Sequence, residues 1–166
     1  LTFLQRFVSE CTGILRLGIG ELQVCFAGEK GEIVSQLIDG RYPKYEDFIP
    51  KENDRKVEVD RIKLLSGVKM ASFMTNEEYR MVKFIFKQGK LVLSARTADV
   101  GEAELEVAIK YEGPDFEISF DPVYIADALK VSDGDTVVME FGVGDSAVLI
   151  RTGYEQFDVV MPLEMK

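Results

Sequence analysis

The sequence predicts an α+β protein made of repeated units, in which a short helix precedes a β-hairpin and one more strand. Three hairpins of similar shape recur, at residues 15–26, 82–94 and 137–150. Each turns at glycine and alternates apolar with polar side chains over part of its length, as half-buried antiparallel strands do. Because the pattern returns after roughly 55 residues, it indicates an internal repeat.

A helix is expected before each hairpin. Residues 2–11 carry apolar side chains at helical spacing, and residues 60–73 open on Asp60 as a possible N-cap. The third helix opens on Asp121, and Pro122 then occupies the first helical position, where its missing N–H is tolerated. The expected buried faces contain Phe3, Leu4, Phe7 and Val8, then Leu64, Leu65, Val68 and Ala71, then Ile125, Ala128 and Leu129.

The remaining strands complete the units. Closing strands are expected at residues 32–38, 104–111 and 157–163, and leading strands at residues 56–59 and 116–120. One unit cannot bury both its helix face and its sheet face, whereas two units can pack helix to helix. We therefore predict helices on one side of antiparallel sheets, with residues 53–166 as a complete two-unit domain and residues 1–52 as half of another.

The composition narrows the class of protein. The 166 residues carry a net charge of −9 and contain no histidine, which removes the commonest general base and the usual zinc ligand. The acidic average argues against tight nucleic-acid binding, although a ring can be acidic outside and basic on one surface.

No apolar run approaches the roughly 20 residues of a membrane span. The chain begins at Leu1, which suggests a fragment, and Cys11 and Cys25 are expected to be free thiols.

The segment of residues 38–50 carries the most specific local signal. Asp39-Gly40 is a turn pair, and Pro43 and Pro50 exclude a regular helix or central strand. Large apolar side chains stand between them. Such a segment is either a tightly packed connector or one wall of a binding groove, and this stretch alone favours the connector.

Two motifs are specific as a pair: LIDGRYPKY at residues 37–45, followed by Ile49-Pro50, and VVMPL at residues 159–163. With them, the whole chain resembles the bacterial sliding clamp family, the β subunit of DNA polymerase III. The resemblance implies the DNA-clamp fold. Residues 1–52 would be the second half of the clamp's middle domain, and residues 53–166 the complete C-terminal clamp domain.

The resemblance also implies a function. Members of the family are homodimeric rings in the bacterial cytoplasm that encircle double-stranded DNA and serve as processivity factors in DNA replication, without a cofactor or a catalytic residue. Basic side chains on the helices would face the DNA, here Arg6, Lys69, Arg80 and Lys130. An ordinary solvated surface charge remains the alternative for each of them.

In this family, DNA polymerase III, the clamp loader and repair proteins insert a short peptide with hydrophobic anchors into a groove. The resemblance places that groove at Pro43, Phe48, Val159, Val160, Met161, Pro162, Leu163 and Met165. By alternation, some of the strand residues must instead belong to the core. The polar rim departs from the family's pattern, because Glu46 and Asp47 stand where basic residues are frequent and the tail carries Glu164 and Lys166.

Phe73 and Met74 match the position at which family members form their dimer interface, while the alternative for Phe73 is packing back onto the core.

Two other functional classes stay open. A non-catalytic β-rich scaffold without DNA would share the fold. An enzyme would need a carboxylate pair, such as Asp133 with Asp135 or Glu102 with Glu104, and these pairs are better interpreted as a turn and as solvent-facing strand residues.

Overall fold

The structure is a computed structural model that describes residues 2–51, 53–76, 80–97, 101–142, 146–153 and 156–163. The chain divides into two compact units, Leu1–Pro43 and Lys44–Lys166. Within the described residues, no helix is both long enough and apolar enough to span a membrane.

The first unit is one helix and one antiparallel sheet, as the repeat pattern predicts. Its elements are α1 (Thr2–Glu10), β1 (Arg16–Ile19), β2 (Gln23–Gly28) and β3 (Gly31–Gln36), with the strands in the order β1-β2-β3. None of the described residues 2–43 is fully buried. Phe3 is 75% exposed and Val8 43% exposed, whereas Leu4 and Phe7 are partly buried, so this unit's own residues cover only part of the apolar face predicted for α1.

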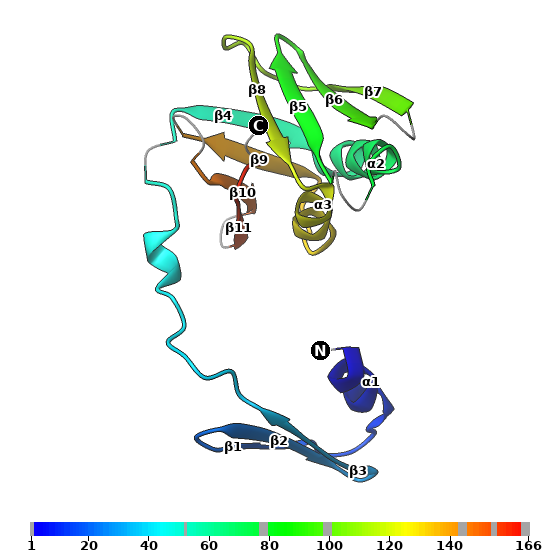
Figure 1. Ribbon diagram of the computed structural model, residues 1–166, viewed down its shortest axis with the longest axis vertical. Coiled ribbons are helices and arrows are strands. Elements are labelled where there is room, and N and C mark those ends of the chain that lie inside the picture. Colours follow the sequence, from blue (N-terminus) through cyan, green and yellow to red (C-terminus); the bar gives the residue numbers. More distant parts are fainter. Residues whose placement is uncertain are drawn as a thin grey trace. The chain divides into compact units, whose positions relative to one another are not determined.

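The second unit contains two repeats (Figure 1). Its elements are a short 3-10 helix η1 (Tyr45–Asp47), β4 (Arg55–Asp60), α2 (Arg61–Ser72), β5 (Val82–Lys87), β6 (Lys90–Thr97), β7 (Gly101–Ala108), β8 (Phe116–Phe120), α3 (Pro122–Lys130), β9 (Thr136–Phe141), β10 (Val148–Thr152) and β11 (Gln156–Val160). Each helix, hairpin and leading strand predicted for this part of the chain is present.

The two repeats exchange their leading strands. The strands form two four-stranded antiparallel sheets, in the orders β11-β10-β9-β4 and β7-β6-β5-β8. Strand β4 of the first repeat therefore pairs with β9 of the second, and β8 of the second repeat pairs with β5 of the first. This exchange joins the two repeats into one domain through backbone hydrogen bonds as well as through side-chain packing.

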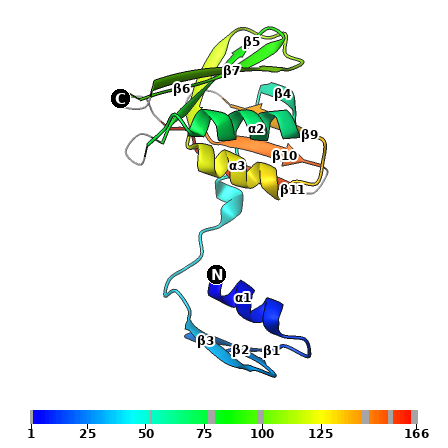
Figure 2. The same ribbon diagram turned by 90° about the vertical axis from the view of Figure 1, so that its right-hand side faces the viewer.

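Both helices begin at the predicted caps. The Asp60 carboxylate accepts a hydrogen bond from the Lys63 N–H at 2.9 Å, and the Asp121 carboxylate accepts one from the Val123 N–H at 2.8 Å. Helices α2 and α3 contact each other and pack against the sheets (Figures 1 and 2). The largest fully buried side chains of the core include Phe84, Phe86, Phe120, Leu64, Leu129 and Ile150.

The closing strand expected at residues 157–163 is shorter than predicted, because β11 ends at Val160. Proline at position 162 has no N–H to donate to a strand partner. The Leu163 N–H instead donates to the Ser119 carbonyl oxygen at 2.8 Å. The tail therefore leaves its own sheet and is tied to the end of β8. The other two closing strands also end early, at Gln36 and Ala108.

Candidate functional site

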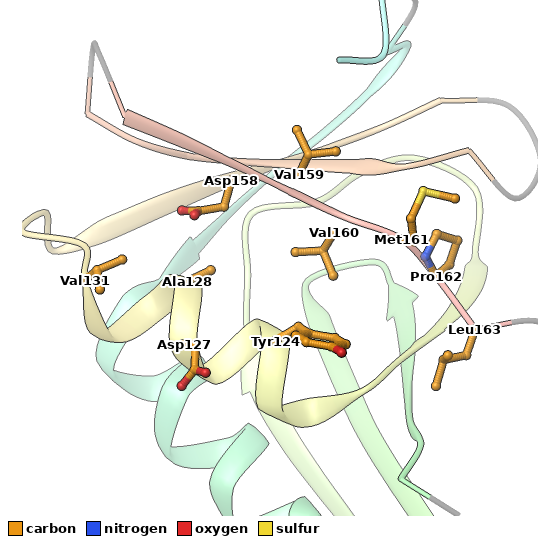
Figure 3. Close-up of a pocket in the computed structure, with 10 residues that line it drawn as sticks. All are labelled: Tyr124, Asp127, Ala128, Val131, Asp158, Val159, Val160, Met161, Pro162 and Leu163. Carbon is orange, nitrogen blue, oxygen red and sulfur yellow. The ribbon is translucent and has the colours of Figure 1, made fainter. Parts of the chain in front are cut away.

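A pocket of about 580 Å³ opens between helix α3, strand β11 and the tail that follows it (Figure 3). It is lined by Tyr124, Asp127, Ala128, Val131, Asp158, Val159, Val160, Met161, Pro162 and Leu163. Seven of these ten residues have aliphatic, proline or methionine side chains, and an eighth is tyrosine. The lining of the pocket is therefore mostly apolar, which suits a hydrophobic side chain of a partner better than a polar metabolite.

Helix α3 supplies one wall through the side that does not enter the core. Ile125 and Leu129 are fully buried, whereas Tyr124 is 63% exposed and Val131, the C-cap residue, is 61% exposed. The helical period separates these two sets of side chains. An exposed tyrosine and an exposed valine on one side of a short helix leave apolar area that the described residues do not cover.

Strand β11 and the tail supply the other wall. Val160 is 7% exposed and belongs to the core, whereas Val159 points to the opposite side of the strand in Figure 3. Beyond the strand, Met161 is 62% exposed and Leu163 40% exposed. The hydrogen bond from Leu163 to Ser119 holds this tail in place. Methionine is flexible and polarisable, so it adapts to apolar surfaces of different shapes.

The pocket has an acidic end. Figure 3 shows Asp158 beside Ala128 and Val131, while Met161, Pro162 and Leu163 lie at the other end. Burial raises the pKa of Asp158 above its ordinary value. Its Oδ2 atom is buried and has no hydrogen-bond partner among the residues that the structure describes. The second acid, Asp127, has a cation beside it, because Lys130 Nζ lies 2.8 Å from its Oδ1.

The structure brings together five of the eight residues predicted for the groove, namely Val159, Val160, Met161, Pro162 and Leu163. Phe48 follows η1, is 61% exposed and is not among the pocket's lining residues. Pro43 belongs to the first unit. Met165, like Glu164 and Lys166, lies outside the described residues. The α3 wall, from Tyr124 to Val131, and Asp158 on β11 were not predicted as parts of the groove.

Of the four residues predicted to face DNA, two occupy equivalent places on their helices. Lys69 and Lys130 lie in the last turns of α2 and α3, where a cation is favoured by the helix dipole. Arg6 lies on α1 of the first unit and pairs with Glu10 at 3.1 Å. Arg80 lines a separate hollow of about 300 Å³ with Ser72, Thr75, Asn76, Pro122 and Val123. Except for Arg6 and Lys130, no cation of this set has an ion pair among the described residues.

The two residues predicted for the dimer interface differ in exposure: Phe73 is exposed and Met74 is partly buried. Phe73 is the C-cap residue of α2 and is 74% exposed, so its ring is not packed back onto the core. Met74 is partly buried and packs against the core. The carboxylates considered for an enzyme are exposed, with Asp133 and Asp135 between α3 and β9 and Glu102 and Glu104 on β7.

The sequence was compared with protein families and with curated proteins, and both comparisons point to one family. A sequence model of the family "DNA polymerase III beta subunit, C-terminal domain" matches residues 46–164. A beta sliding clamp of Pseudomonas putida is 29% identical over 98% of this chain and 45% of its own length. The chain therefore spans less than half the length of this relative.

Solved structures agree on the fold. A sliding clamp from Pseudomonas aeruginosa aligns with a TM-score of 0.81 and 28% identity, over 98% of this chain and 45% of its own. A sliding clamp from Bartonella birtlesii, bound to griselimycin, aligns with a TM-score of 0.84 and 30% identity, over 98% and 44%. The strand-exchanged repeats are thus the sliding-clamp fold, and the chain belongs to the DNA polymerase III beta subunit family.

Proposed function

We propose that this chain is the C-terminal part of a bacterial DNA sliding clamp, a non-catalytic processivity factor that closes as a ring around double-stranded DNA. Family membership and the strand-exchanged fold support the proposal. Encirclement and ring closure would belong to the longer protein, because the chain spans 45% of a curated relative. We place this protein in the bacterial cytoplasm, where the DNA is.

Within this chain, we propose that the pocket between α3 and the tail is part of a groove that docks short peptide segments of DNA polymerase III, the clamp loader and repair proteins. The observation that carries this proposal is the exposed apolar wall made by Tyr124, Met161 and Leu163. Tyrosine and methionine are typical anchors of protein interfaces. The predicted residues Pro43, Phe48 and Met165 would extend the same groove.

We further propose that Lys69, Arg80 and Lys130 face the DNA, together with Arg6, and that Phe73 contacts a second subunit. Phe73 has the exposure that an interface anchor needs. The charge of Lys130 is partly offset by Asp127, so we expect it to contribute less to DNA attraction than Lys69. The net charge of −9 would then reside mainly on surfaces away from the DNA.

Docking can be tested with one matched pair of variants. Met161→Ala removes an apolar side chain from the pocket, whereas Met70→Ala removes the same side chain from the exposed surface of α2, where Met70 is 48% exposed. We expect Met161→Ala to weaken the binding of a short peptide with leucine and phenylalanine anchors about fivefold or more. The affinity is measured by fluorescence anisotropy.

The Met70→Ala variant reports any general effect of losing an exposed methionine. If both variants bind the peptide as tightly as the parent chain, the pocket is not the docking site. An equal loss in both would point to an effect on the fold, which a thermal unfolding curve for each variant would reveal.

A further inference from the structure

Asp158 is a partly buried carboxylate on the core-facing side of β11. It stands opposite Ile150 in the β10–β11 pairing, and Ile150 is fully buried. Two residues further along, Val160 is also in the core. Because side chains alternate along a strand, Asp158 points to the helix-packed side of the sheet, where it lines the pocket. A carboxylate at such a position is costly unless a donor or a cation compensates it.

Glu140 shows how this sheet compensates a buried carboxylate. Its Oε1 atom lies 3.1 Å from Lys56 Nζ and 3.0 Å from Arg151 Nε, and Asn53 donates a hydrogen bond to its Oε2. Burial raises the pKa of Glu140, but the three donors outweigh burial and hold that pKa below its ordinary value. Asp158 is shifted in the opposite direction, because burial acts on it without such partners.

Among the described residues, no side chain that lines the pocket compensates the charge of Asp158. None of the ten lining residues is basic, and Lys130, the last residue of α3, pairs with Asp127 instead. The apolar residues Tyr124, Met161 and Leu163 lie towards the other end of the pocket (Figure 3). The pocket therefore combines apolar anchor positions with one uncompensated negative group.

We propose that the acidic end of this pocket is a specificity subsite for an arginine or lysine side chain of the docked segment, with the Asp158 carboxylate as its acceptor. The inference rests on the proposed docking function and goes further by naming the chemistry of the partner. The anchors would enter near Met161 and Leu163, and the basic side chain would extend over Val131 to Asp158. Arginine suits the site well, since its planar guanidinium can donate two parallel hydrogen bonds to a carboxylate.

Another explanation for Asp158 predicts a different result. Strand β11 is at the edge of its sheet, and an inward-pointing charge on an edge strand discourages pairing with other chains. In that case Asp158 would protect the edge and would have no preference for a basic partner. A test must therefore measure the preference itself.

The test compares capped peptides that share leucine and phenylalanine anchors and differ at one flanking position, which holds either arginine or citrulline. Citrulline has nearly the same shape without the charge, so the affinity ratio isolates the electrostatic contact. The arginine is moved through each flanking position in turn. At the best position we expect the parent chain to bind the arginine peptide about fivefold more tightly than the citrulline peptide.

In Asp158→Asn, that ratio should fall to about one, because the amide keeps the shape but loses the charge. The matched control is Asp133→Asn, which removes the same charge from the exposed turn after α3; its ratio should remain that of the parent. A ratio near one in the parent chain, or a preference that survives Asp158→Asn, would overturn the inference.

The two proposals fail in different ways. If the citrulline peptides bind and the arginine preference is absent at every position, docking stands and only the subsite is wrong. If no peptide of either set binds, the docking function is wrong, and the subsite is wrong with it.

Discussion

Two carboxylates of one sheet, Glu140 and Asp158, show how the same chemical group serves different purposes. Glu140 holds Lys56, Arg151 and Asn53 together across β4, β9 and β10. Its side chain is 8% exposed, so these contacts are shielded from solvent more than a surface ion pair is. Asp158 has no such partners among the described residues. The contacts of Glu140 stabilise the fold, whereas the carboxylate of Asp158 can still accept a hydrogen bond from a partner.

Glu140→Gln should lower the free energy of unfolding at pH 7 by about 1–2 kcal/mol, because two cations lose their shared acceptor. The pKa of Glu140 is lowered by folding, so its stabilisation is present above the ordinary value of 4.5 and is lost as the pH falls through the folded pKa. Urea unfolding curves at pH 7 and near pH 3 measure both effects.

The control for this variant is Glu104→Gln, which removes the same charge from an exposed position on β7. It should change stability by less than about 0.5 kcal/mol. If Glu140→Gln costs no more than Glu104→Gln at pH 7, the buried network does not stabilise the domain.

At the scale of elements, the exchange of β4 and β8 makes each sheet depend on both repeats. A second connection links the helices at their ends. Arg61, the first residue of α2, donates from Nε to the Gly134 carbonyl at 2.5 Å and from a terminal nitrogen to the Leu129 carbonyl at 3.1 Å. It thereby satisfies the Leu129 carbonyl, one of those that the C-terminal end of α3 leaves free, and ties down the turn at Gly134 between α3 and β9.

Arg61→Lys should therefore destabilise the second unit by about 1–2 kcal/mol, since lysine keeps the charge but cannot reach two carbonyls with a fixed fork of donors. The unfolding free energy from urea titration measures the effect. Arg96→Lys makes the same replacement at an exposed position on β6 and should be close to neutral. Equal effects in the two variants would contradict the role assigned to Arg61.

The elements were predictable because each has a local signal. Asp60 and Asp121 mark helix starts through their own hydrogen bonds, and glycine turns with alternating side chains mark the hairpins. Strand exchange has no local signal, because alternation says which face of β4 is buried but not which strand lies beside it. The closing strand was predicted too long although Pro162 marks its end; the sequence does not show that the Leu163 N–H finds its partner on β8.

The candidate site was half predictable. The tail, Val159 to Leu163, was found through its motif. Tyr124 and Val131 were not found, because the helical period places them where solvent-facing residues belong, and only the tertiary structure shows the tail beside them. Nothing in the local sequence marks Asp158 as unusual. Its position opposite Ile150, which makes it unusual, depends on the register of β10 and β11.

At the scale of the whole molecule, the two units differ in how much apolar surface they bury. The second unit has a continuous core, whereas none of the described residues of the first unit is fully buried. The second unit also contains the pocket and the whole region that the family model matches. We therefore expect peptide docking to be measurable in this chain through the second unit.

The most direct test of the docking proposal is a titration of the isotope-labelled chain with a short peptide that carries leucine and phenylalanine anchors, followed by backbone amide shifts in NMR spectra. We predict saturable shifts for Tyr124, Val131, residues 158–161 and Leu163, with little change on β5, β6 and β7; Pro162 has no amide proton to observe. Shifts that spare α3 and the tail would contradict the proposal, and so would a spectrum that does not change in a large excess of peptide.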